Sequence, residues 1–335
     1  GGGGGGAGNY TGNLSSAGGG GGGSSGDNNA GQIAALKTIA DFARENTASR
    51  PTPVGSFQYK AGIAIPTVKT YTDAKVTGVT DSNIESINDA LATSSVTDTS
   101  VNTAEKLQTV VNAYNQIISL ANGAVNTDIL PPTFTEYQLI GVTGLDASTT
   151  QAAKLLSSVI DLKRYADIDT VNEIQALANI ANRVIAAAAG NATLTTADLE
   201  ALGLNLTGVL DFTKVISAIV GTNDNGTGVD SFEELQTLID GVVGTAATAL
   251  KSIVEFAQAN TNSAPTPPVV GVSVPVTSTY KTAGVKGVSD TNVASINDAL
   301  MTDSVKGESV DTLAKLQSLV DAYNGLLDLA DGIGN

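Results

Sequence analysis

The sequence predicts an all-α protein built from tandem helical hairpins, stacked as a short solenoid or as a string of small helical bundles. Three observations predict this fold. The stretch GVTDSNIESINDAL (78–91) returns as GVSDTNVASINDAL (287–300), with ten of the fourteen positions identical. An octet that ends in glutamine occurs four times. The apolar residues that follow it recur at the spacing of an amphipathic helix.

The four octets mark equivalent points in four copies of one unit. A second marker, a tyrosine or a leucine, lies 37 or 38 residues before each octet's glutamine and is followed by a turn that pairs glycine with aliphatic residues. The octets are VNTAEKLQ (101–108), IDTVNEIQ (168–175), VDSFEELQ (229–236) and VDTLAKLQ (310–317), and the second markers are Tyr71, Tyr137, Leu199 and Tyr280.

These markers divide the chain into an arm, a lone helix and four repeats. The arm is rich in glycine, and the lone helix, which is followed by a proline linker, matches the end of a preceding repeat. Repeat 3 carries an extended helix and a second proline linker. The boundaries are 1–31 for the arm, 32–53 for the helix and linker, 54–126 for repeat 1, 127–191 for repeat 2, 192–264 for repeat 3 and 265–335 for repeat 4.

Each repeat is predicted to hold two helices. In repeat 1, Thr80 is the expected N-cap of the first helix, and the apolar residues after it follow helical spacing. The second helix is expected to begin at the second residue of each octet, which is Asn102, Asp169, Asp230 or Asp311. The segments 54–71 and 269–280 are rich in β-branched residues and interrupted by proline, so they predict short extended pieces or edge strands.

Composition limits the chemistry of this chain. It carries 17 basic and 33 acidic residues, a net charge of -16, which opposes binding to nucleic acids and anionic membranes. It has no cysteine and no histidine, which excludes disulfides, Cys/His metal sites and His-dependent catalytic triads. No unbroken apolar run reaches the length of a membrane span. We therefore expect no enzymatic activity, no nucleic-acid partner and no membrane insertion.

One loop resembles a calcium site in composition. The segment GTNDNGTGVDSFEEL (221–235) gathers Asn223, Asp224, Asn225 and Asp230 around glycines. Aligned on Gly226, a calcium loop would need carboxylates at the positions of Gly221 and Phe232, and neither is acidic. The sequence favours an Asx-rich turn capped by Asp230, with no metal and no cofactor, and calcium stays as the weaker alternative.

Two further sets of residues recur in the repeats. Asp81, Asp89, Asp290 and Asp298 are expected to occupy helix first turns and solvated faces, with carboxylate chemistry or cation binding as the alternative. A set of tyrosines is expected to seal the contacts between adjacent units, with stacking on sugars as the alternative. The tyrosines are Tyr71, Tyr114, Tyr137, Tyr280 and Tyr323.

The phrases AGVKGVSDTNVASINDAL and VDTLAKLQSLVDAYNGLLDLADG resemble the helical repeats of very large secreted bacterial surface proteins, the RTX-type and biofilm-associated adhesins. The resemblance covers roughly residues 32–335, is best in repeats 1 and 4, and is loosest in repeat 3. The calcium-binding nonapeptide of RTX proteins is absent from the sequence. The resemblance implies a role at the bacterial cell surface or in the extracellular matrix, and it carries no catalytic residue over.

Together these observations predict a non-catalytic structural protein, secreted by a bacterium and placed outside the cell. Its expected partners are other copies of itself, joined head to tail into a filament or adhesin stalk, with the arm (1–31) clasping the next subunit. The alternative is an adhesion module that binds calcium or cell-surface glycans.

Overall fold

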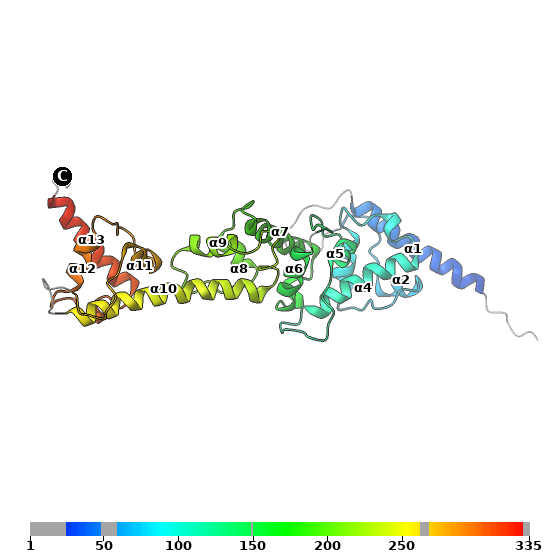
Figure 1. The fold of residues 1–335 in the computed structure, drawn as a ribbon. Helices are drawn as coiled ribbons and strands as arrows, with labels where there is room; N and C mark the ends of the chain where they lie inside the picture. The colour runs from blue at the N-terminus through cyan, green and yellow to red at the C-terminus, as the bar shows by residue number, and fades with distance from the viewer. Residues whose placement is uncertain (1–24, 48–58, 149, 262–267, 331–335) are drawn as a thin grey trace, which may run out of the picture.

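The computed structural model describes residues 25–47, 59–148, 150–261 and 268–330, and over these residues the chain is all-α, as predicted (Figure 1). They contain no β-strand, and an isolated antiparallel bridge joins Asn122 to Arg164. The α-helices are α1 (Ser25–Thr47), α2 (Val68–Asp73), α3 (Ile84–Leu91), α4 (Ala104–Leu120), α5 (Phe134–Leu139), α6 (Gln151–Asp161), α7 (Val171–Ala188), α8 (Thr196–Ala201), α9 (Phe212–Val220), α10 (Phe232–Asn260), α11 (Thr277–Thr282), α12 (Val293–Leu300) and α13 (Leu313–Ala330). Three short 3₁₀ helices, η1 (Asp98–Ser100), η2 (Tyr165–Asp167) and η3 (Gly307–Ser309), precede α4, α7 and α13.

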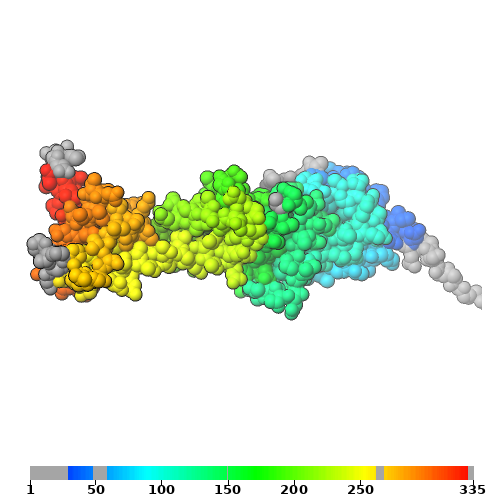
Figure 2. All heavy atoms as spheres, viewed as in Figure 1, coloured from blue at the N-terminus to red at the C-terminus, as the bar shows by residue number. Residues whose placement is uncertain are grey.

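The helices follow one another along an elongated body with two apolar cores (Figures 1 and 2). The larger core runs from α1 to the first part of α10, and the smaller one runs from the last part of α10 to α13. Tyrosines, valines, leucines, isoleucines and alanines fill both cores, in keeping with a chain that is poor in aromatic residues. Helix α10 is therefore the element that the two cores share.

A glutamine closes each hairpin. The side chain of the octet's last residue accepts a hydrogen bond from a backbone N–H in the preceding turn, and it donates to the carbonyl of the same residue. These two hydrogen bonds fix the turn against the second helix of its repeat. The acceptor and donor distances are 2.9 and 3.0 Å for Gln108 with Thr77, 2.8 and 2.9 Å for Gln175 with Thr143, 2.8 and 3.1 Å for Gln236 with Asn205, and 2.8 and 3.0 Å for Gln317 with Lys286.

The second helices begin one residue later than the sequence predicted. A hydroxyl residue, the third of each octet, accepts from the backbone N–H three positions on, and its backbone is extended in repeats 1, 2 and 3. These caps are Thr103, Thr170, Ser231 and Thr312. The prediction of Thr80 as a cap was also wrong, because its N–H donates to Asn83 Oδ1 (2.7 Å) in a turn before α3.

The predicted extended segments are partly helical, and over the described residues each repeat holds three α-helices rather than the predicted two. The terms first helix and second helix keep the meaning they have in the sequence, which is the helix before the octet and the helix that begins at the octet. Residues 68–71 belong to α2, and residues 277–280 belong to α11. Thr67 caps α2 with its hydroxyl, and the Tyr71 ring lies fully inside the core. Capping and burial outweigh the strand preference of the β-branched residues here.

The lone helix also begins earlier than predicted. Helix α1 starts at Ser25, inside the span assigned to the arm. Residues 1–24 of the arm and most of the two proline linkers (48–58 and 262–267) lie outside the described residues.

Two helices end in the same way. At the end of α1, the buried Asn46 donates from Nδ2 to the Phe42 carbonyl (2.9 Å) and accepts from the Lys60 N–H (2.7 Å). At the end of α10, Asn260 makes the equivalent bonds to the Phe256 carbonyl (2.8 Å) and the Val269 N–H (2.6 Å). Each asparagine therefore ties the helix end to the segment that follows the proline linker.

Helix α10 has the length and composition of a membrane span, the one such helix among the described residues. A search for an unbroken apolar run misses it because Asp240, threonines and glycines interrupt the sequence. Its two ends pack into the two cores through Leu235 and Ile239 on one side and Ile253 and Phe256 on the other. In this structure α10 serves as a connecting helix.

Candidate functional site

The contact between repeats 1 and 2 centres on a buried carboxylate. Asp89 Oδ2 accepts a hydrogen bond of 2.7 Å from the backbone N–H of Val171, the first residue of α7. Both residues are buried. A helix N-terminus carries unpaired N–H groups and a partial positive charge, so a carboxylate there is favourable. The expectation that Asp89 lies on a solvated face was wrong, because repeat 2 covers it.

Hydroxyl groups surround this carboxylate. Ser86 Oγ donates to the Asp169 carbonyl (2.6 Å) and lies 2.7 Å from the hydroxyl of Tyr165. Tyr165 also donates to the Ser82 carbonyl (3.1 Å), and Tyr114 donates to the Asp169 carbonyl (3.1 Å). These bonds satisfy polar atoms that the contact would otherwise bury without partners.

The charge of this contact makes it sensitive to pH. Burial, followed by the negative charge of Glu173 and a hydrogen bond with it, raises the pKa of Asp169 from 3.8 to about 6, and Asp89 and Glu85 add to the rise. The carboxylates gather at the start of α7 with no basic partner among the groups that shift this pKa. Ionisation of Asp169 therefore works against the contact at neutral pH.

The contact between repeats 2 and 3 has the same plan. Ser158 Oγ accepts a 2.6 Å hydrogen bond from the N–H of Phe232, the first residue of α10. Ser158 is equivalent to Asp89, because the residue before each of them, Ser157 or Asn88, donates to a proline carbonyl and bonds to the marker tyrosine of its repeat, Tyr137 or Tyr71. We call this arrangement the joint: a polar side chain near the end of one repeat's first helix meets the first N–H of the next repeat's second helix.

The recurring tyrosines divide into two groups. Tyr71, Tyr137 and Tyr280 are buried, and their hydroxyls bond within their own repeats, to Asn88 (2.6 Å), Ser157 (2.8 Å) and Asn297 (2.6 Å). The helices that carry them, α2, α5 and α11, pack against the last helix of the preceding unit, α1, α4 and α10. Burial raises the pKa of all three phenols, so each stays a neutral hydrogen-bonding group. Tyr114 does reach the next repeat, and Tyr323, its equivalent in repeat 4, is partly exposed.

The loop considered for calcium is held by its own hydrogen bonds. Asn225 Oδ1 accepts from the N–H (3.1 Å) and the hydroxyl (2.9 Å) of Thr227, and Asn223 Nδ2 donates to that hydroxyl (3.2 Å). Asp230 forms an ion pair with Lys154 (3.3 Å), while Asp224 is exposed. The loop thus has the Asx turn that the sequence favours, but Asp230 contacts repeat 2 and Ser231 caps α10. Among the described residues, acidic side chains form no group of three suited to a metal ion.

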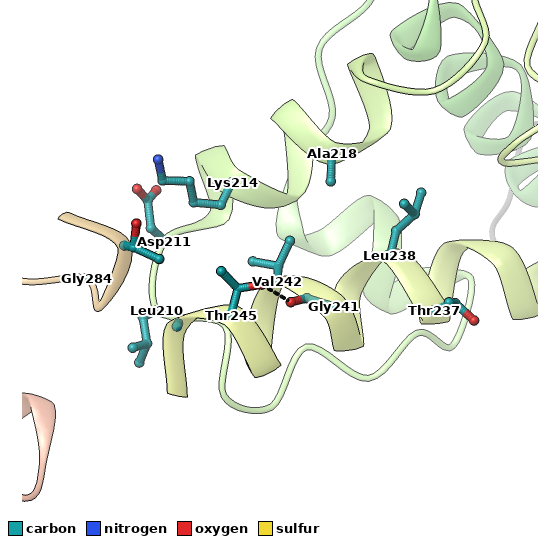
Figure 3. Close-up of a pocket in the computed structure, with 12 residues that line it drawn as sticks. Leu210, Asp211, Lys214, Ala218, Thr237, Leu238, Gly241, Val242, Thr245 and Gly284 are labelled. Carbon is teal, nitrogen blue, oxygen red and sulfur yellow. Dashed lines mark hydrogen bonds between the residues drawn. The ribbon is translucent and has the colours of Figure 1, made fainter. Parts of the chain in front are cut away.

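A cleft of about 510 Å³ lies where the two cores meet, between α9, α10 and the turn after α11 (Figure 3). Its walls are mainly apolar, with Leu238, Val242 and Ala218 facing the opening. The charged residues that line it are Asp211 and Lys214. The Asp211 carboxylate caps α9, and its hydrogen bond to the Thr213 hydroxyl lowers its pKa.

The joint depends on several residues that sequence reasoning missed. Ser158 and Tyr165 belong to no recurring motif, since the equivalent positions in other repeats hold different residue types, and Ser86 recurs as Ser295 without any pattern that indicates a contact. A signal does exist in hindsight, because Asp89 and Ser158 come two and three residues before the last residue of a first helix. That signal becomes visible only once the helix ends are known.

Comparison with protein-family models, curated proteins and solved structures finds no match to this chain. The resemblance to the repeats of bacterial adhesins therefore stays a prediction. The site that the geometry describes best is the set of joints between helical units.

Proposed function

We propose that this chain is a non-catalytic structural protein, a rod of tandem helical repeats that serves on a bacterial surface or in a secreted matrix and associates head to tail with copies of itself. The observation that carries the proposal is the recurrence of the joint. Asp89 and Ser158 each receive the first N–H of the following repeat's second helix. Such joints fix the orientation of one unit on the next, which a spacer or stalk requires.

The elongated shape supports the same role. The units follow one another from α1 to α13 without folding back (Figures 1 and 2), and α10 carries the chain from one core to the other. In repeat architectures each unit contacts its neighbours, so length grows with the number of units. An array of this kind separates its two ends, which is the task of a stalk.

The chemistry of the chain supports a role without catalysis. The sequence has no histidine or cysteine, and the clustered carboxylates Asp89, Asp169 and Glu173 lie at a packed joint rather than in a cleft. The net charge of -16 keeps such a rod soluble and apart from nucleic acids.

Small-angle X-ray scattering tests the rod. We expect a distance distribution with the long tail of an extended particle at pH 7. The double substitution Ser86→Ala with Asp89→Lys should broaden this distribution, because it removes a hydroxyl donor and a carboxylate acceptor from the first joint and places a cation at a helix N-terminus. The matched control is Ser295→Ala with Asp298→Lys, at the equivalent and more exposed positions of repeat 4. A compact particle, or equal effects of the two variants, would argue against the proposal.

Self-association and location need separate measurements. Sedimentation velocity over a hundredfold range of concentration, with electron microscopy of the same samples, should show linear oligomers. A chain that stays monomeric throughout would refute the head-to-tail part of the proposal. Antibody labelling of intact and permeabilised cells of the source organism tests location, and labelling only after permeabilisation would refute a surface role.

A further inference from the structure

Repeats 1 and 4 have the same internal structure. Asn83 Nδ2 donates to the Gly78 carbonyl and to Asn115 Oδ1, both at 2.8 Å. Its equivalent in repeat 4, 209 residues later, is Asn292, which donates to the Gly287 carbonyl and Asn324 Oδ1 at the same distances. Any difference between the outer surfaces of these repeats therefore comes from their neighbours.

Those outer surfaces do differ. In repeat 1, Ile117 is 0% exposed and Leu120 is 2% exposed. Their equivalents on α13, Leu326 and Leu329, are 64% and 66% exposed. Two exposed leucines one turn apart on one helix are unusual for an isolated surface.

The polar part of the joint shows the same contrast. Asp298 is exposed, whereas its equivalent Asp89 is fully buried. Ser295 is partly exposed, whereas its equivalent Ser86 is buried. We call Ser295, Asp298, Tyr323, Leu326 and Leu329 the open face of repeat 4.

The structure shows what covers this face in repeat 1. Helices α5 and α6 of repeat 2 pack on α4, which carries Ile117 and Leu120. The start of α7 supplies the Val171 N–H to Asp89, and Tyr165 and the Asp169 carbonyl bond to Ser86. One helical unit thus provides both the apolar cover and the hydrogen-bonding partners.

We propose that the open face of repeat 4 is a docking surface for a helical unit of the repeat 2 kind. Such a unit presents a tyrosine hydroxyl and the free N–H of a helix N-terminus beside an apolar surface. Asp298 would accept the helix N–H, Ser295 would bond the tyrosine, and Leu326 and Leu329 would be buried. This inference rests on the proposed structural role, and it adds the chemistry of the next unit in the array.

An extended chain tests the docking. Residues 127–191 are appended directly after Asn335, which aligns with Asn126 and so keeps the natural register. Because the sequence has no cysteine, Ser295→Cys combined with Asp169→Cys in the appended unit gives one defined pair. We expect a disulfide under mild oxidation, and at least a tenfold slower amide hydrogen exchange over 326–329 than in the unextended chain.

Two control pairs of cysteines give reference rates of disulfide formation. Ser86→Cys with Asp169→Cys in the unextended chain reports the rate at the existing joint. Asn191→Cys in the appended unit, paired with Ser295→Cys, reports random encounters, since the 18 residues of α7 place that position about 27 Å from the joint. Adding Asp298→Lys should slow the expected disulfide at least fivefold.

The outcomes separate the two proposals. A disulfide from position 295 to position 169 of the appended unit that forms tenfold faster than the position 191 control supports the docking. A rate equal to that control, when the existing joint forms its disulfide, overturns it. A disulfide joining position 295 of two chains also overturns it, because the face would then meet its own copy. The scattering test of the rod is independent of all three results.

Discussion

Asp89 Oδ2 lies 2.7 Å from the backbone nitrogen of Val171, 82 residues further along the chain. Its counterpart Asp298 has nearly the same local sequence and the same helix position, yet it faces solvent. The two aspartates therefore differ in their neighbours rather than in their own repeats, and comparing them isolates the contribution of the joint.

Asp89→Ala should lower the free energy of unfolding by about 1–3 kcal/mol, because it leaves the buried Val171 N–H without this acceptor. Urea denaturation followed by far-ultraviolet circular dichroism measures the change. Asp298→Ala is the matched control, and it should change stability by less than about 0.5 kcal/mol because the side chain is exposed. Equal losses in the two variants would contradict the assigned role of Asp89.

Asp169→Asn should change how stability depends on pH. The folded-state pKa of about 6 lies above the ordinary value of 3.8, so the protonated form favours the folded joint. This contribution is fully present below pH 3.8 and is lost as the pH rises through about 6. Asparagine carries no charge. At pH 7.5 the free energy of unfolding of the variant should therefore be higher than that of the native chain by on the order of 1 kcal/mol, after allowance for solvent screening.

Thermal melting at pH 4.0 and 7.5 measures this effect. The native chain and Asp169→Asn should melt alike at the lower pH and differ at the higher one. Asp81→Asn, at an exposed position of the same repeat, should show no such divergence. A variant that is less stable than the native chain at pH 7.5 would show that the Asp169 carboxylate helps the joint as an anion.

Gly141→Ala should destabilise the first joint through a direct clash. Gly141 has a φ of +98°, and a Cβ there would lie 2.0 Å from Thr93 Oγ1 and 2.6 Å from Thr93 Cβ, across the boundary between repeats 1 and 2. Gly62→Ala is the control, since its φ is +83° but no atom lies within 4 Å of the added Cβ. We expect the control to cost about 1 kcal/mol from backbone strain and Gly141→Ala to cost at least about 2 kcal/mol more. Equal costs in denaturant titrations would exclude the clash.

Tyr280→Phe should destabilise the smaller core without affecting the larger one. The substitution removes the 2.6 Å hydrogen bond to Asn297 Oδ1, whose side chain is buried. Amide hydrogen exchange should accelerate over 277–300 and stay unchanged over 68–91. Tyr71→Phe should give the reverse pattern, because it breaks the equivalent bond to Asn88 in the larger core. Acceleration in both regions from either substitution would show that the cores unfold together.

The helical nature of the chain could be predicted because it depends on local pattern. Apolar spacing and the octets locate α4, α7, α10 and α13 to within a few residues. The caps were misplaced by one residue because Asp, Asn, Ser and Thr all suit that role. The extended backbone at Thr103, Thr170 and Ser231 determines which of two adjacent polar residues is the N-cap, and sequence alone does not reveal that backbone conformation.

The joint could not be predicted because it depends on distant partners. The carboxylate of Asp89 and the hydroxyl of Ser158 serve the same purpose with different chemistry, so no shared motif marks them. Segment 68–71 shows the opposite error, since its β-branched residues indicated a strand while the burial of Tyr71 selected a helix. In both cases long-range packing determines the outcome.

The middle of α10 has a mechanical consequence for the whole chain. This helix spans 29 residues, about 43 Å, and between Asp240 and Leu250 the one buried residue is Ala246. Gly241 and Gly244 have no side chains that could pack against a neighbouring element. Their carbonyls each accept a hydrogen bond from a threonine hydroxyl, Thr245 for Gly241 and Thr248 for Gly244. Backbone hydrogen bonds in a helix run parallel to its axis, so tension on the ends of the chain loads them one after another. We expect this stretch of α10 to unfold and lengthen first under a pulling force, so that both cores stay folded at forces that already extend the helix.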